Sequence, residues 1–206
     1  MKLFYSPGAC SLGIHVLLEE IGKPFEPALV SVRDGSNRKP EYLALNPKAK
    51  VPALLRDDGV VLTEFPAIAV WLARTNPKVG LLPTDPDVEA QALEIMDYIV
   101  ATVHMQGFTR VARPANFTPS EADIEAVKAR GRELFAAGMD LLDKGIEGRE
   151  FAAGDHFSVA DAALIFVENW APRADYPLPA NLAAHFARMK ARPAVQRAFA
   201  TEGLAI

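Results

Sequence analysis

The sequence has 206 residues, of which 50% are hydrophobic and 23% are charged, a composition typical of a globular chain with a sizeable core. The net charge of −4 argues against a nucleic-acid or membrane-surface binder, and no apolar run approaches the ~20 residues of a membrane span. The single cysteine excludes an internal disulfide framework, and the N-terminal apolar run is too short for a signal peptide, so we expect a cytoplasmic protein.

The first 75 residues alternate between strand and helix patterns. The predicted elements, in chain order, are a strand at 2–6, a helix at 11–22, a strand at 25–32, a short helix or turn at 39–47, a hairpin at 51–64 and a helix at 65–75. Gly22 ends the first helix, Asp57-Asp58-Gly59 separates the hairpin strands, and Pro66 lies in the first turn of the last helix.

The remainder of the chain is helical. A proline-rich segment over 78–87 predicts a linker, and apolar residues then recur at helical spacing over 88–108, 119–146, 158–171 and 178–204. Arg192-Pro193 divides the last of these segments. The sequence therefore predicts an α/β N-terminal domain over 1–77 and an all-α C-terminal domain over 88–206.

Three turns of the N-terminal domain carry candidate chemistry. Cys10 precedes the first helix, and a helix N-terminus favours an anion. The Cys10 sulfur therefore suits either a nucleophile or a site that holds another molecule's thiolate. The alternative is that Cys10 is an inert small side chain. A cis Val51-Pro52 bond would turn the Val51 backbone toward an extended peptide. Thr63 or Glu64 is expected to cap the following helix, which favours a carboxylate.

These features, in this order, resemble the glutathione transferase family. The stretches that carry the resemblance are "MKLFYSPGACSLGIHVLLEE", "NPKAKVPAL", "LTE" after the hairpin, and "HFSVADAAL", in which Ser158 and Asp161 match a capping box. The cysteine at position 10 makes the chain most similar to the bacterial beta class. The resemblance covers the whole chain and implies a thioredoxin-like N-terminal domain.

The resemblance also implies a site and an activity. It implies that glutathione is bound by Tyr5, Cys10, Lys50, Val51, Pro52, Glu64 and Phe65, and that Cys10, Ser11 and His104 are catalytic. The implied reaction is transfer of the glutathione thiolate to small apolar electrophiles, with a glutathione-dependent thiol–disulfide or peroxide activity through Cys10 beside it. The resemblance further implies a homodimer that uses glutathione as co-substrate. The net charge, the short apolar runs and the spacing of histidine and cysteine predict no nucleic-acid, membrane or metal partner.

Two positions depart from the family pattern. Many members carry a serine after the glutamate, where this chain has Phe65, so one hydroxyl contact to glutathione is missing. The beta-class histidine aligns without a gap on Met105, and His104 lies one residue earlier, a rotation of about 100° on a helix. Either the helix has a one-residue bulge or the histidine has lost its role. The alternative function is a non-catalytic binding or carrier protein for apolar ligands.

Overall fold

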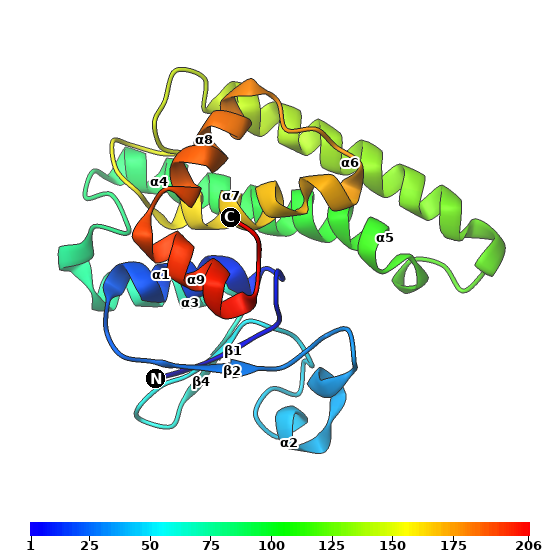
Figure 1. Ribbon diagram of the computed structural model, residues 1–206, viewed down its shortest axis with the longest axis horizontal. Helices are drawn as coiled ribbons and strands as arrows, with labels where there is room; N and C mark the ends of the chain where they lie inside the picture. Colours follow the sequence, from blue (N-terminus) through cyan, green and yellow to red (C-terminus); the bar gives the residue numbers. More distant parts are fainter. The chain divides into compact units, whose positions relative to one another are not determined.

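The structure, a computed structural model, describes all of residues 1–206. No helix in it has the length and apolar character that a membrane span requires. The chain forms two compact units (Figure 1): unit 1 comprises residues 1–82 and 189–206, and unit 2 comprises residues 83–188. The sequence groups residues 189–206 with the helical segments, whereas in the structure they belong to unit 1, because their helix packs on the first helix of the chain. The domain limits drawn from the sequence stay a prediction.

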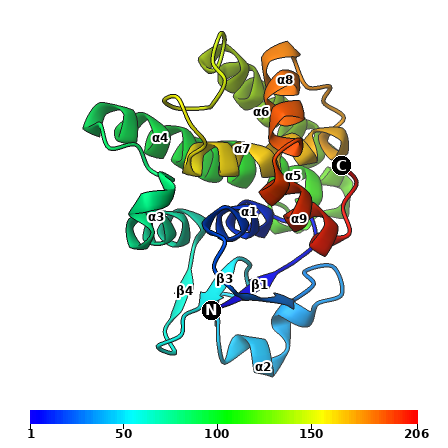
Figure 2. The ribbon, with the colours of Figure 1, turned by 60° about the vertical axis from the view of Figure 1, so that its left-hand side comes forward.

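Unit 1 is built on a four-stranded mixed sheet with the strand order β2-β1-β3-β4 (Figure 2). The strands are β1 (Lys2–Tyr5), β2 (Glu26–Leu29), β3 (Ala53–Leu55) and β4 (Val61–Thr63). β1 runs parallel to β2 and antiparallel to β3, and β3 pairs antiparallel with β4. The predicted hairpin is confirmed, and its turn contains Gly59 at a φ of 83°, a conformation that favours glycine.

Helices cover both faces of this sheet. They are α1 (Ser11–Ile21), α2 (Pro40–Leu43), α3 (Phe65–Thr75) and α9 (Pro193–Glu202), with short 3-10 turns at Ser36–Arg38 and Pro77–Val79. α1 packs against β1, α3 and α9, and its first eight residues are buried. On the other face, Phe4 packs with Tyr42 of α2 and with Val51. The predicted thioredoxin-like α/β fold of the N-terminal domain is confirmed.

Unit 2 is helical, as the sequence predicts. Its elements are α4 (Pro86–Tyr98), a π-helical stretch (Ile99–Phe108), α5 (Thr109–Ala112), α6 (Ile124–Gly145), α7 (Val159–Trp170) and most of α8 (Ala180–Lys190). Short 3-10 turns lie at Pro114–Asn116, Glu121–Asp123 and Ala171–Ala174. The π-helical stretch packs against α6 and α7, so it lies inside the bundle.

The segment predicted as one helix over 88–108 changes its winding halfway. It is α-helical to Tyr98 and π-helical from Ile99 to Phe108. The amide and the hydroxyl of Thr109 both donate to the carbonyl of His104, five residues earlier. A π turn holds one more residue than an α turn. The structure therefore contains the bulge that the sequence left open at His104.

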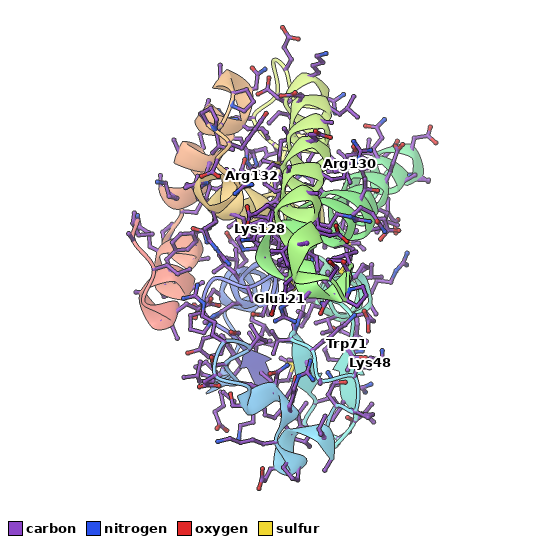
Figure 3. The ribbon with its side chains drawn as sticks, turned by 90° about the vertical axis from the view of Figure 1, so that its right-hand side faces the viewer. Lys48, Trp71, Glu121, Lys128, Arg130 and Arg132 are labelled. Carbon is purple, nitrogen blue, oxygen red and sulfur yellow. The ribbon has the colours of Figure 1, made fainter.

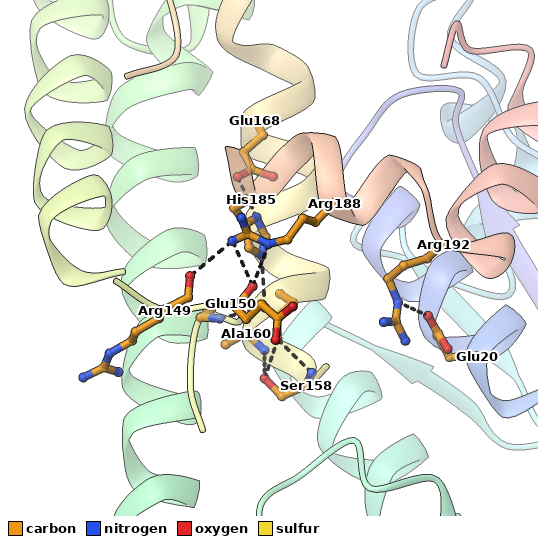
Figure 4. A network of polar contacts seen from close by, with 11 residues as sticks. Glu20, Arg149, Glu150, Ser158, Ala160, Glu168, His185, Arg188 and Arg192 are labelled. Carbon is orange, nitrogen blue, oxygen red and sulfur yellow. Dashed lines mark hydrogen bonds and ion pairs between the residues drawn. The ribbon is translucent and has the colours of Figure 1, made fainter. Parts of the chain in front are cut away.

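A buried polar network ties the start of α7 to α8 (Figure 4). Ser158 and Asp161 form the predicted capping box, and Asp161 Oδ1 also accepts from the amide of Ala152 at 2.7 Å. His185 on α8 bonds to Asp161 Oδ1 at 3.0 Å and to Glu168 Oε1 at 2.8 Å. Burial alone would lower the pKa of His185, but the two carboxylates outweigh it and raise that pKa to about 9. Burial raises the pKa of Glu168.

The sequence predicts core positions for Trp71, Trp170 and Phe166, and of these Trp170 and Phe166 are buried. Trp71 on α3 is only half-buried, and the guanidinium of Arg56 lies over its ring, 4.8 Å from the centroid. Figure 3 shows Trp71 among the side chains of unit 1. The assignment of Trp71 to the core was therefore wrong: its outer face is covered by a charged side chain, which sequence spacing does not reveal.

Candidate functional site

Cys10 lies at the end of the loop that joins β1 to α1, at the N-cap position of α1. Its side chain is half-buried, and its thiol donates to the backbone carbonyl of Val51 at 3.4 Å. No side chain caps this helix end, so the first-turn amides and the helix dipole favour an anion here. The structure thus brings together two residues that the sequence singled out 41 positions apart.

Ser11 stabilises the loop between β1 and α1 through hydrogen bonds to the backbone of Ser6. Its side chain is completely buried, and its Oγ accepts from the amide of Ser6 at 3.2 Å and donates to the carbonyl of Ser6 at 3.3 Å. Ser6 Oγ in turn accepts from the amide of Val32 at 3.2 Å. The hydroxyl that the resemblance assigns to catalysis is therefore engaged by the backbone of the Cys10 loop, and its catalytic role stays a prediction.

The Val51-Pro52 peptide bond is cis, as the resemblance to the family implies. The loop before it is held by three side chains. Asn37 donates to the carbonyl of Ala49 at 2.6 Å, and Tyr42 and Asn46 both donate to the carbonyl of Lys50, at 2.6 and 2.8 Å. The Val51 backbone, which is the candidate partner of an extended peptide, is thus held in place before any ligand arrives.

A second charged group lies at the start of α3. Glu64 occupies the N-cap position at φ 71° and ψ 126°, and its side chain makes no capping bond. Lys48 instead bridges Glu64 Oε1 at 2.7 Å and Thr63 Oγ1 at 2.8 Å. Ala49 also has a positive φ, of 55°. Such backbone conformations cost about 1–3 kcal/mol each in residues other than glycine and gather at functional sites.

Sequence reasoning named Lys50 for the site, whereas the structure places the side chain of Lys48 on Glu64. The Lys50 side chain is exposed, and only its backbone carbonyl takes part in the loop. Lys48 and Lys50 both lie shortly before the cis proline, and the sequence gives no reason to prefer one of them as a ligand-binding residue. Ala49 between them has a positive φ, a local change of backbone direction that alanine does not signal in a sequence.

Two further predicted residues point into the core. The side chain of Phe65, the first residue of α3, is buried, so any contact with a ligand would come from its backbone. Tyr5 is buried on the α1 side of the sheet, with its ring 5.5 Å from that of His15. Burial raises the pKa of Tyr5, and the nearby charge of Glu202 adds to that shift. Their roles toward glutathione stay predictions.

In unit 2, the π-helical stretch settles which residue turns inward. The ring of His104 lies 4.8 Å from that of Trp170 and 5.8 Å from that of Phe166, whereas Met105 is exposed. His104 is half-buried among these rings. The π-helical winding supplies the change of helical register that the bulge alternative requires, and the catalytic role of His104 stays a prediction.

Comparison with known proteins agrees with this arrangement. The family model described as glutathione S-transferase, N-terminal domain, matches residues 8–75, and that described as glutathione S-transferase, C-terminal domain, matches residues 125–200. The chain is 39% identical to the glutathione S-transferase GstA of Escherichia coli O157:H7, over 99% of this chain and 100% of that protein. The chain belongs to the glutathione S-transferase family.

Solved structures of the glutathione S-transferase family give the same result. A glutathione transferase homologue from Sulfitobacter with bound glutathione has a TM-score of 0.92 at 31% identity, covering 99% of this chain and 98% of that one. A bacterial beta class glutathione S-transferase from Sphingomonas chungbukensis has a TM-score of 0.86 at 34% identity, covering 100% of both chains. The predicted resemblance to the beta class of this family is confirmed.

Proposed function

We propose that this chain binds glutathione in unit 1 and transfers its thiolate to small apolar electrophiles. The observation that carries the proposal is the 3.4 Å contact between the Cys10 thiol and the Val51 carbonyl. It sets an anion-favouring helix N-terminus beside the backbone that precedes the cis proline. A tripeptide whose backbone pairs with Val51 would bring its own sulfur to that helix end.

The far end of glutathione has a matching pair of charges. Its γ-glutamyl group carries an ammonium and a carboxylate on one carbon. Glu64 suits the ammonium, whereas Lys48 and the first amides of α3 suit the carboxylate. The backbone amide of Phe65 takes the place of the serine hydroxyl that many relatives use. We therefore assign Lys48 to the site in addition to the residues that the sequence named.

Catalysis in this proposal rests on positioning and on stabilising the glutathione thiolate. The N-terminus of α1 supplies the positive electrostatic potential that stabilises the thiolate. Cys10 lies beside the glutathione sulfur, and Ser11 fixes the conformation of the loop between β1 and α1. Because Cys10 is the chain's only cysteine, a thiol–disulfide or peroxide activity through it would use glutathione as the resolving thiol. His104 is proposed as a further catalytic residue.

The finer parts of the proposal are the electrophile, the assembly and the location. We propose an apolar electrophile, a homodimer and a cytoplasmic enzyme. The relatives' names, which are those of transferases, support an enzyme over the non-catalytic carrier. Transfer to an aryl halide, gel filtration with light scattering, and cell fractionation test these three parts separately.

Calorimetric titration of the reduced protein with glutathione is the decisive test. Wild type is expected to bind in the micromolar to low millimolar range. Lys48→Gln is expected to weaken binding about tenfold, since a hydrogen bond to a charged group contributes roughly 1.5–3 kcal/mol. Lys50→Gln should have a smaller effect, and the opposite order would show that Lys48 is the wrong lysine. No binding by wild type at tens of millimolar would refute the proposed function.

A further inference from the structure

Unit 2 contains a pocket that the proposed function does not use. Its volume is about 410 Å³, which lies within the range of sites for small molecules. It is lined by the end of α7, the 3-10 turn at Ala171–Ala174, the irregular segment 175–178 and Phe186 of α8. All of these residues belong to unit 2, and none of them is assigned above to glutathione or to catalysis.

Most of the lining is apolar. Pro172, Pro177 and Leu178 contribute aliphatic surface, and Tyr176 and Phe186 contribute aromatic rings that are half-buried. The Tyr176 hydroxyl donates to Asp140 on α6, so it is not a free polar group of the pocket. An apolar or aromatic ligand would remove this surface from water, which favours binding.

Glu168 is the buried charged residue of this pocket. It lines the pocket although its side chain is fully buried, so its carboxylate lies at the pocket floor and is closed to bulk water. Oε1 bonds to His185 Nδ1 at 2.8 Å, whereas Oε2 has no hydrogen-bond partner. A buried carboxylate oxygen without a donor is unfavourable and uncommon in native structures. The missing donor is the feature that points to a ligand.

The cations of the chain near Glu168 are engaged elsewhere (Figure 4). Arg188 donates to the carbonyls of Arg149 and Glu150 at 3.0–3.2 Å. His185 uses one nitrogen for Glu168 Oε1 and the other for Asp161 Oδ1. A donor for Glu168 Oε2 must therefore come from a bound molecule.

The charges of the lining indicate which kind of molecule this is. Glu168 and Asp175 are its only charged residues, and both are acidic. Asp175 is already paired with Arg132 Nε at 2.9 Å, which leaves Glu168 as the unsatisfied one. A cationic donor would form a charge-assisted hydrogen bond with Oε2 and would favour the ionised carboxylate, whereas an anion would be repelled.

We propose that this pocket is a binding site for a small primary amine that carries an apolar or aromatic group. The ammonium donates to Glu168 Oε2 after a small adjustment of the pocket floor, and the apolar group packs against Tyr176, Leu178 and Phe186. An aromatic ring beside the ammonium adds a cation–π attraction. The inference goes beyond the proposed function and does not depend on it.

The probe is 2-phenylethylamine, with 2-phenylethanol and phenylacetate as neutral and anionic compounds of similar size. Calorimetric titration of the full chain at neutral pH is expected to show binding of the amine, binding of the alcohol about tenfold weaker, and no binding of phenylacetate. Saturating glutathione should leave the Kd of the amine within about twofold, because no residue is shared between the two sites. If wild type fails to bind glutathione, the proposed function falls, and the amine titration still decides this inference.

A charge-removing variant and a matched control locate the site. Glu168→Gln keeps the size of the side chain and an oxygen for His185, so it should weaken binding of the amine about tenfold or more and leave binding of the alcohol within about twofold. Glu150→Gln makes the same change on an exposed residue of unit 2 that does not line the pocket, and it should leave binding of both probes unchanged. Equal losses for the amine and the alcohol in Glu168→Gln would show a collapsed pocket without charge recognition, and the inference would be wrong.

A second variant keeps the test decisive if Glu168→Gln does not fold. Leu178→Trp adds bulk from the half-buried wall of the pocket, and it should weaken binding of both probes about tenfold. The inference is wrong if wild type binds the amine no more tightly than the alcohol, or if Leu178→Trp binds the amine as tightly as wild type does.

Discussion

Gly107, in the π-helical stretch, lies where that stretch crosses α6, and its replacement by alanine tests how closely these helices must pack. A Cβ at position 107 would lie 2.9 Å from the backbone Cα and N of Phe135 and 3.2 Å from its Cβ. Ordinary contacts between such atoms are 3.4–4 Å. The two helices would have to separate by about half an ångström or more, and backbone atoms cannot rotate away as a side chain can.

The expected cost of Gly107→Ala follows from this distance. Overpacking of a well-packed core costs about 1–3 kcal/mol, and the higher helix propensity of alanine returns up to about 1 kcal/mol. The net loss of about 1–2 kcal/mol corresponds to a fall in Tm of roughly 2–8 °C in a chain of this size. Thermal unfolding followed by far-ultraviolet circular dichroism measures it.

Gly145→Ala is the matched control. Gly145 ends α6, and a Cβ there would meet nothing within 4 Å, so the variant should unfold at the same temperature as wild type or slightly above it. An unchanged or raised Tm in Gly107→Ala would refute the claim that the close approach of the π-helical stretch to α6 is rigid.

Three further predictions concern unit 2. Because the pKa of His185 is raised to about 9, its protonated form stabilises the fold fully below pH 6.5, and this stabilisation is lost as the pH rises through 9. The free energy of unfolding of wild type, measured with urea, should therefore fall by on the order of 3 kcal/mol between these pH values, whereas that of His185→Gln should not. Ser158→Ala removes the N-cap of α7 and should lower the free energy of unfolding by about 1–2 kcal/mol, with Ser120→Ala, whose side chain caps no helix, as the control. In steady-state assays, His104→Gln should lower kcat for glutathione transfer about tenfold or more, while Met105→Leu should leave kcat unchanged. If the two substitutions change kcat equally, the assignment of His104 is wrong.

Local signals were sufficient for much of this fold. The order of strands and helices, the hairpin at 57–59, the end of α1 at Gly22 and the capping box at Ser158 were all predicted, because each depends on residues within a few positions of one another. Cys10 was singled out in the same way, from its place before a helix, whereas the cis Val51-Pro52 bond was implied only by the family resemblance.

The tertiary structure alone decided which side chains meet. The contact between Lys48 and Glu64 spans 16 positions, and the inward turn of His104 lies in a π-helical stretch that apolar spacing does not distinguish from an α-helix. The bond from Gly8 to Glu202 joins residues 194 positions apart, and no local pattern encodes such a contact. The sequence by itself thus determined the elements and the candidate thiol, whereas the packing of α9 on α1 determined which carboxylate accepts from the Gly8 amide in the loop before that thiol.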